Sequence, residues 1–149
     1  MSGGGTHDAR AVVLIKNSAA GRASITLSRL ELNTNSGIWE VTDVATDGMA
    51  LTSPQSAQQL TSPVQVTRSQ AALAGQLTTI TIFDHDRTAI GQSRLPPVSG
   101  AGTTPFAIRV PYASSFQGGA QEGSIVLYRY TRNHVIAGAV MVKVLLNAS

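Results

Sequence analysis

The stretch Leu77–Asp84, with the sequence Leu-Thr-Thr-Ile-Thr-Ile-Phe-Asp, is an unbroken strand signal around which the rest of this chain is arranged. It contains no Gly or Pro, and its β-branched and aromatic side chains favour extended backbone. The polar residues Asp84-His85-Asp86-Arg87 end the stretch with a turn, and Thr88–Arg94 follows as the second strand of a hairpin. This pattern predicts that Leu77–Asp84 is a central strand of a β-sandwich.

Short apolar runs and turn signals alternate along the chain around this strand. Further strands are predicted at Val64–Val66, Phe106–Val110, Ser124–Thr131 and Ala137–Leu146. In the strand predicted at Ser124–Thr131, one face is shared by Val126, Tyr128 and Tyr130. A helical turn is expected only in the Ala-rich connection Ser69–Gly75, because no helical apolar period of useful length occurs. The prediction is an all-β fold, with an antiparallel β-sandwich over residues 49–149.

A three-stranded antiparallel β-meander is predicted over residues 10–48, before the sandwich. Its strands are expected at Ala11–Lys16, Ser24–Leu32 and Ile38–Val44, with turns at Asn17–Arg22 and Asn33–Gly37. A change of apolar phase predicts a β-bulge near Ser28-Arg29. Residues 1–9, which include a Gly run, are predicted to be a flexible leader.

The bulk composition limits the class of protein. The chain has 149 residues, of which 42% are hydrophobic and 13% charged, which argues against a disordered chain. The net charge of +3 comes from scattered Arg residues, whereas nucleic-acid binding needs clustered charge, so we expect no nucleic-acid partner. The chain has no Cys, which excludes disulfides and thiolate chemistry. No apolar run is long enough for a membrane span, and the N-terminus lacks the apolar region of a signal peptide.

Several short motifs carry a family resemblance between Leu51 and Leu146. They are Thr52-Ser53-Pro54, Leu60–Val66, Gly75-Gln76-Leu77, Ile80–Asp84, Pro105–Ile108, Ile125–Tyr130 and Ala137–Val144. This part of the chain resembles the immunoglobulin-like domain named from bacterial spore germination proteins. It departs from that family at Arg68, near a usual Gly, and at Leu73-Ala74, in place of an aromatic-acidic pair.

The resemblance implies an immunoglobulin-like sandwich and a non-catalytic interaction module of the bacterial cell envelope or of a secreted protein. The partner would be a protein or a cell-wall glycan, the location extracytoplasmic or secreted, and the signal segment would be absent from this chain. Family members often follow another domain, so the meander at residues 10–48 is interpreted as the remnant of an upstream domain or as a reduced companion to the sandwich.

The triplet Asp84-His85-Asp86 is the motif whose residue types most resemble those of a metal or catalytic site. Asp84 and Asp86 are weak candidates for a metal site, but Ca²⁺ requires six or more oxygens and no calcium-binding loop follows. A turn in which Asp84 caps backbone N–H groups is the favoured interpretation. The histidines His7, His85 and His134 fall in predicted loops, and no G-x-S-x-G motif is present. We therefore expect no enzyme, no cofactor and no catalytic residue.

Aromatic side chains are the candidates for ligand or partner contacts. A platform that stacks on a carbohydrate or peptide could be formed by Trp39, Tyr112, Tyr128 and Tyr130, although packing in the core or between modules is favoured for Trp39. Phe116, in a predicted Gly-containing loop, is the better candidate for an exposed contact.

Self-assembly is the alternative function. A sandwich has edge strands, and polar edges with few charges are poorly protected against pairing. Strand exchange, with Ala11–Leu32 as the donor, would give a homo-oligomer or a filament. A metal-dependent site at Asp84-His85-Asp86 is a third and weaker alternative.

Overall fold

The computed structural model describes residues 7–14, 22–33, 36–71, 77–95 and 103–149. The strands are β1 (His7–Leu14), β2 (Arg22–Asn33), β3 (Ser36–Thr46), β4 (Met49–Ser53), β5 (Gln59–Leu60), β6 (Val64–Ala71), β7 (Leu77–Phe83), β8 (Ala89–Leu95), β9 (Thr103–Val110), β10 (Ala120–Tyr130) and β11 (Ile136–Asn147). Within these ranges, no helix has the length and hydropathy that crossing a membrane requires.

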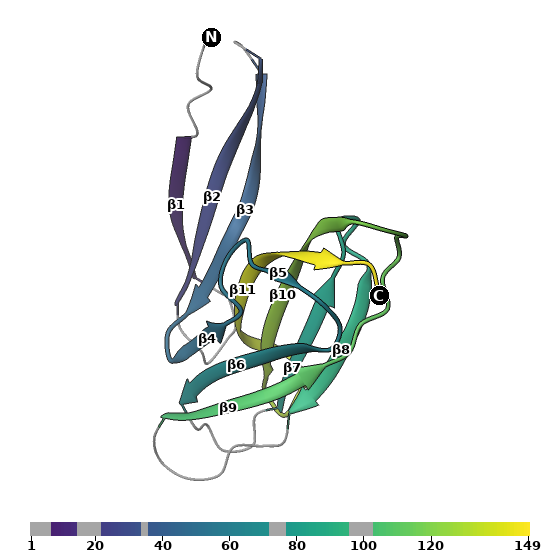
Figure 1. Ribbon diagram of the computed structural model, residues 1–149. Coiled ribbons are helices and arrows are strands. Elements are labelled where there is room, and N and C mark those ends of the chain that lie inside the picture. Colours follow the sequence, from purple (N-terminus) through teal and green to yellow (C-terminus); the bar gives the residue numbers. More distant parts are fainter. Residues whose placement is uncertain (1–6, 15–21, 34–35, 72–76, 96–102) are drawn as a thin grey trace.

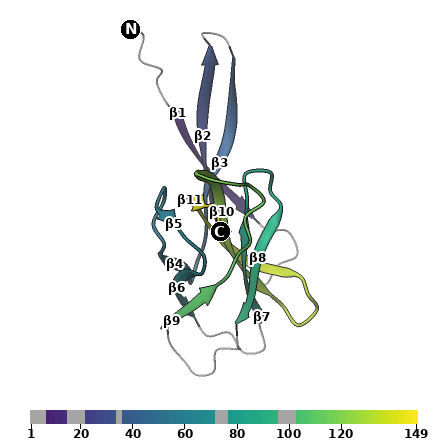
Figure 2. The same cartoon turned by 45° about the vertical axis from the view of Figure 1, so that its right-hand side comes forward.

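Two sheets pack face to face in the sandwich (Figures 1 and 2). The smaller sheet has the order β4-β6-β9, and the larger has the order β1-β2-β3-β11-β10-β7-β8. All of these neighbours are antiparallel, and the short strand β5 adds to β11 in parallel. The predicted all-β fold with antiparallel packed sheets is therefore confirmed.

The core lies between the smaller sheet and the β11-β10-β7-β8 part of the larger one. Ile80 and Ile82 of β7 are fully buried, and they belong to one cluster with Val66 of β6 and Leu127 of β10. β7 pairs with β8 on one side and with β10 on the other. Leu77–Asp84 thus has the central position that its composition predicts, because its β-branched side chains fill the space between the sheets.

The strands β1, β2 and β3 form the predicted antiparallel meander and continue the larger sheet. Among the described residues, the only strand pairing between this meander and the sandwich is that of β3 with β11, at Met141↔Val44 and Val142↔Asp43. Most of the meander extends beyond the sandwich in both views (Figures 1 and 2). We call β1, β2 and Ser36–Val41 of β3 the arm.

Three local predictions differ from the structure. His7–Ala9 belong to β1, so His7 lies in a strand, and residues 1–6 are outside the described part. The register between β2 and β3 shifts at Thr26/Leu27 and at Glu31/Asn33, rather than at Ser28-Arg29. Strand β6 continues to Ala71, where a helical turn was expected, because all its residues pair with β9. In the predicted turn Asn17–Arg22, residues 17–21 lie outside the described part. Leu73 and Ala74, where the sequence departs from the family, also lie outside it.

Two arginines occupy inward positions of the sandwich. Arg68 of β6 is 1% exposed and Arg129 of β10 is 2% exposed. The Arg68 guanidinium lies 5.6 Å from the centre of the Phe106 ring, which is a cation–π contact. Arg129 donates from Nη2 to the carbonyl of Ala137 at 3.5 Å. Burial lowers the pKa of both groups, because it disfavours the charged form.

Candidate functional site

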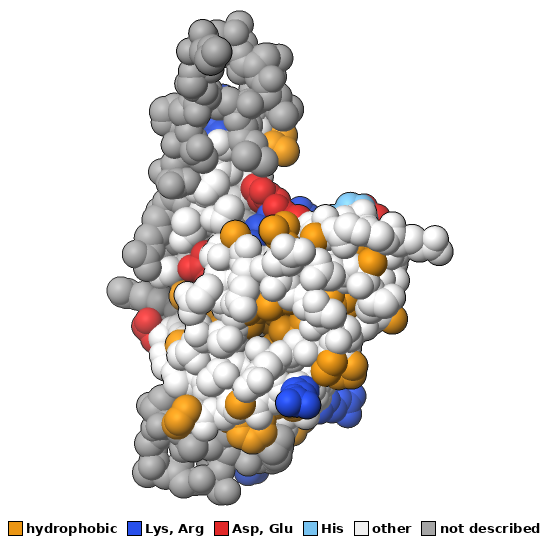
Figure 3. Space-filling model, in the orientation of Figure 1, with side chains coloured by type: hydrophobic (Ala, Val, Ile, Leu, Met, Phe, Trp, Pro, Cys, Tyr) orange, Lys and Arg blue, Asp and Glu red, His pale blue; other side chains and the backbone are white. Residues whose placement is uncertain are grey.

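A half-open groove of about 390 Å³ lies where the arm meets the sandwich. Its lining residues come from β3, β10, β11, the end of β7 and the turn after β7; they are Glu40, Val41, Phe83, Asp84, His85, Arg87, Glu122, Gly123, Ser124, Val126, Tyr128, Met141 and Lys143. Figure 3 shows acidic and basic side chains gathered at this junction. We call this feature the junction groove.

The floor of the junction groove is the outer face of the larger sheet. Val126 of β10 lies opposite Thr81 of β7 and Met141 of β11, and cross-strand partners share a face. Tyr128 lies two residues further along β10 on the same face, and its ring centre is 6.0 Å from that of Tyr130. The alternation of β10 places Ile125 and Leu127 in the core and turns Val126 and Tyr128 to the other face. Val126 is 7% exposed at the bottom of the groove, and the half-buried Tyr128 and Met141 complete its apolar floor.

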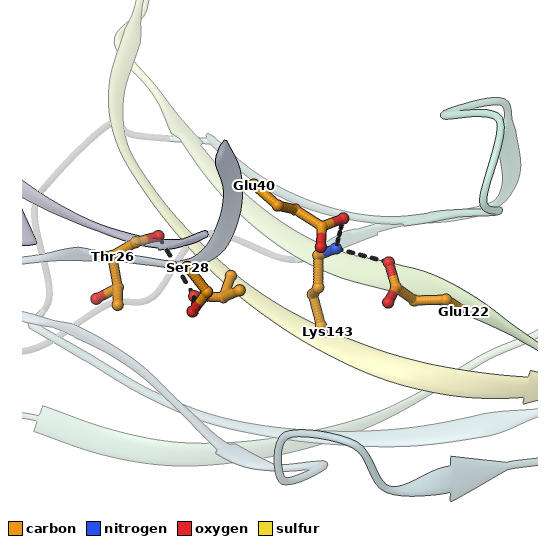
Figure 4. A network of polar contacts seen from close by, with 6 residues as sticks. Thr26, Ser28, Glu40, Glu122 and Lys143 are labelled. Carbon is orange, nitrogen blue, oxygen red and sulfur yellow. Dashed lines mark hydrogen bonds and ion pairs between the residues drawn. The ribbon is translucent and has the colours of Figure 1, made fainter. Parts of the chain in front are cut away.

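An ion-pair network forms the wall on the arm side (Figure 4). Lys143 Nζ donates to Oε1 of Glu122 at 2.6 Å and to Oε1 of Glu40. Glu40 belongs to the arm, whereas Lys143 and Glu122 belong to the sandwich. Burial opposes the charge of Lys143, but the hydrogen bonds and charges of Glu122 and Glu40 outweigh it and raise the pKa of Lys143.

The turn after β7 forms the opposite wall, and Asp84 organises it. Asp84 Oδ1 accepts from the backbone N–H of Asp86 at 3.0 Å and of Thr88 at 2.8 Å. Its Oδ2 accepts from Ser115 Oγ at 2.5 Å. The Ser115 hydrogen bond, supported by the two backbone N–H groups, lowers the pKa of the Asp84 carboxyl despite its burial. The prediction that Asp84 caps its turn is confirmed.

The same contacts bear on the metal candidates. Three donors occupy the carboxylate oxygens of Asp84, so these oxygens are committed to the turn. Asp86 is an exposed neighbour of His85, with 3.2 Å between His85 Nε2 and Asp86 Oδ2. In the described part of the chain, no group of three or more His, Cys, Asp or Glu side chains could hold a metal ion. The geometry favours a turn rather than a metal site.

Two of the three predicted contact residues lie at the end of the sandwich. Tyr112 is 5% exposed, so it offers little surface for the expected contact. Its hydroxyl donates to the Asn147 carbonyl at 2.7 Å and lies 3.2 Å from the Leu60 carbonyl. Phe116 is half-buried against the core, so part of its ring stays exposed and it keeps its place as a candidate contact.

Trp39 is more exposed than the sequence interpretation favoured. Packing was favoured for this residue, yet it is 53% exposed on the arm, opposite Arg29 of β2. Its neighbour Ile38 is 52% exposed, and adjacent strand residues point to opposite faces. Both faces of the arm are therefore uncovered at this point. Trp39 keeps its place as a candidate partner contact, although it does not line the junction groove.

The residues that sequence reasoning missed are Lys143, Glu40 and Glu122. They come from three strands, and Lys143 is separated from Glu40 by 103 positions, so no local motif joins them. The one available signal was Lys143 itself, a single charge in the apolar run Ile136–Leu146. A lone charge in such a run indicates the outward face of a strand.

Comparison with known proteins adds no relative to this description. A scan against protein-family models finds no match to the chain, and a search of curated proteins also finds none.

Proposed function

We propose that this chain is a non-catalytic interaction module of a bacterial cell-envelope or secreted protein, and that it binds its partner in the junction groove. The observation that carries the proposal is the groove itself. It combines an apolar floor at Val126, Tyr128 and Met141 with charged walls, which is the usual chemistry of a binding surface.

The strand order supports an immunoglobulin-like sandwich for this module. The sheet β4-β6-β9 faces the sheet β11-β10-β7-β8, and β5 adds to β11, so the chain changes sheets after β4, β5, β6, β8 and β9. An immunoglobulin-like domain distributes its strands between two sheets in this way. The outer face of the larger sheet, which carries the groove, is then a surface that such modules can offer to a partner.

The site chemistry favours binding over catalysis. Ser115, the hydroxyl nearest to a carboxylate here, donates its hydrogen bond to Asp84. A nucleophilic serine instead needs a base that accepts its proton and a third group that orients that base. Lys143, which has two carboxylate partners, is held protonated by them and is unsuited to act as a base.

Site-specific photo-crosslinking tests the proposal. A photo-reactive amino acid is placed at Met141 in the groove and, as the matched control, at Leu145, which is 37% exposed on the same strand and lies outside the groove lining. In the organism that encodes the chain, we expect an adduct from position 141 that position 145 does not give. Equal labelling at both positions, or no adduct from position 141, contradicts the proposal.

Co-sedimentation with purified peptidoglycan identifies the class of partner. If the partner is a wall glycan, the wild-type protein sediments with it, and Met141→Arg reduces the bound fraction at least tenfold because it fills the groove with charge. Leu145→Arg is the control and should bind as the wild type does. If the partner is a protein, position 141 gives the photo-crosslinked adduct, but the chain does not sediment with peptidoglycan.

Self-assembly through strand pairing is the second candidate function. The observation that favours it is the arm, in which β1 is an edge strand and Ile38, Trp39 and Val41 are exposed. Edge strands and uncovered apolar faces invite pairing with another chain. Size exclusion with light scattering tests it, and an elution that stays monomeric at high concentration contradicts it.

A further inference from the structure

The turn between β10 and β11 is a well-ordered projection at the far end of the larger sheet. The backbone N–H of His134 donates to the Thr131 carbonyl at 3.0 Å, and that of Thr131 donates to the Val135 carbonyl at 2.9 Å. The Val135 N–H also donates to Thr131 Oγ1 at 3.2 Å. His134 takes the left-handed φ of 58° that closes this turn. These contacts fix the exposed residue Arg132 at the turn's apex.

This end of the sheet is both basic and apolar. Leu77, Val135 and Ile136 are 43%, 45% and 40% exposed, and Arg94 and Arg132 are exposed beside them. The described residues 77–79, 93–95 and 130–136 include no Asp or Glu. We call this surface the basic tip.

The junction groove lies at the opposite end of the same strands. Tyr130 pairs with Leu77 at the basic tip, whereas Ser124 pairs with Phe83 beside the groove. The groove lining holds three carboxylates, those of Glu40, Asp84 and Glu122, against the two cations Arg87 and Lys143. Lys143 contacts Oε1 of Glu40 and of Glu122, so Oε2 of each is available, among the described contacts, to accept from another cation. The groove is thus complementary to the basic tip in charge and in apolar character.

We propose that the partner of the junction groove is a second copy of this chain, whose basic tip docks in it. This inference rests on the proposed role of the groove as the binding surface. The Arg132 guanidinium would bind the Oε2 atoms of Glu40 and Glu122, since a guanidinium suits carboxylates in pairs. Val135 would cover the floor formed by Val126, Tyr128 and Met141. The two surfaces lie on opposite ends of one molecule, so the contact is heterologous and builds a ring or an open row of copies.

A charge-exchange experiment tests this assembly. Sedimentation velocity measures the weight-average mass of the wild type, of Glu122→Arg and of Arg132→Glu across a concentration series, first in about 0.05 M and then in about 0.5 M NaCl, since salt screens exposed ion pairs. We expect the wild type to gain mass with concentration at low salt and to lose that gain at high salt. Each single variant should stay monomeric, because like charges then face one another.

An equimolar mixture of the two variants should restore assembly. In the mixture, the unchanged tip of Glu122→Arg meets the unchanged groove of Arg132→Glu. The altered tip of Arg132→Glu meets the altered groove of Glu122→Arg, so opposite charges face one another at both contacts. Arg132 lies in an exposed turn, so Arg132→Glu is not expected to alter the fold, and equal melting temperatures verify this for both variants.

The failures of the two proposals are distinguishable. A wild type that stays monomeric, single variants that assemble normally, or a mixture that stays monomeric each overturns the head-to-tail contact. If position 141 still forms an adduct with another protein or the chain still binds peptidoglycan, the groove remains a binding surface for a different partner. If Trp39→Glu abolishes assembly and Arg132→Glu does not, the arm is the contact and the present inference is wrong.

Discussion

Lys143 of β11 and Glu40 of β3 form an ion pair that connects the sandwich to the arm. Strands β3 and β11 pair at only two positions. Beyond this ladder, Thr46 Oγ1 donates to the Ala139 carbonyl at 2.8 Å and accepts from the Ala139 N–H at 3.1 Å. The orientation of the arm, and hence the shape of the junction groove, therefore depends on a few contacts.

Replacement of Glu40 should loosen the arm more than it destabilises the sandwich. Glu40→Gln removes one of the two charges that hold Lys143, and a partly exposed ion pair contributes about 0.5–1 kcal/mol. We expect faster hydrogen exchange in β2 and in the arm part of β3, with little change in β7 or β10. Asp47→Asn, in the exposed turn after β3, is the control and should leave exchange unchanged. Uniform loss of protection in all strands contradicts the expectation.

Removal of the Asp84 carboxylate should destabilise the turn after β7. Asp84→Asn retains the size but weakens the hydrogen bonds from Ser115, Asp86 and Thr88, for a loss of about 1–3 kcal/mol in the free energy of unfolding. Urea denaturation at pH 7 measures this loss. Asp86→Asn, at an exposed position, should change the free energy by less than about 0.5 kcal/mol. Equal effects of the two substitutions would count against the capping role.

The destabilisation by Asp84→Asn should also depend on pH. The pKa of Asp84 is lowered in the folded state, so its contribution is fully present above the unfolded pKa, about 3.9. The contribution is lost as the pH falls through the lower, folded pKa. We therefore expect the stability difference between wild type and variant to be constant from neutral pH to about pH 5 and to shrink below about pH 4. A difference that persists unchanged at pH 2 refutes this assignment.

The Tyr112 hydroxyl should stabilise the end of the sandwich. Tyr112→Phe leaves the ring in the core but removes the hydrogen bond to the Asn147 carbonyl, which leaves a buried acceptor without its donor. We expect a loss of about 1–2 kcal/mol in the free energy of unfolding, measured by urea denaturation. Tyr130→Phe, on the outer face of β10, serves as the control with little effect. A neutral Tyr112→Phe substitution would show that water replaces the hydroxyl.

The buried Arg129 should be replaceable by an apolar side chain. Arg129 is 2% exposed, and its described hydrogen bond to the Ala137 carbonyl is long at 3.5 Å. Desolvation of a charge costs several kcal/mol, so Arg129→Met should be neutral or should stabilise by about 1–3 kcal/mol. Thermal unfolding measures the change, and the exposed Arg109→Met is the control. A melting temperature lowered by several degrees would show that the guanidinium has stronger partners than those described.

Local composition was sufficient to predict the strands but not to predict the candidate site. The alternation in Ser124–Thr131 and in Ala137–Leu146 correctly placed Val126 and Tyr128 opposite Ile125 and Leu127. The Asp84 cap was also predictable, because its partners Asp86 and Thr88 lie within four residues. Trp39 and Tyr112 were misjudged because their exposure depends on whether another layer covers the strand or loop that carries them. That coverage has no signature in the neighbouring residues.

The all-β class, the central place of Leu77–Asp84 in a sandwich and the meander that precedes it could be predicted from the residues alone. These features follow from β-branched composition, a period of two residues and turn chemistry, all of which act over a few positions. Two further features required the three-dimensional structure: the meander extends the larger sheet as an arm, and Lys143 lies between Glu40 and Glu122. Both result from pairings across long stretches of chain, where register and packing rather than local propensity select the neighbour.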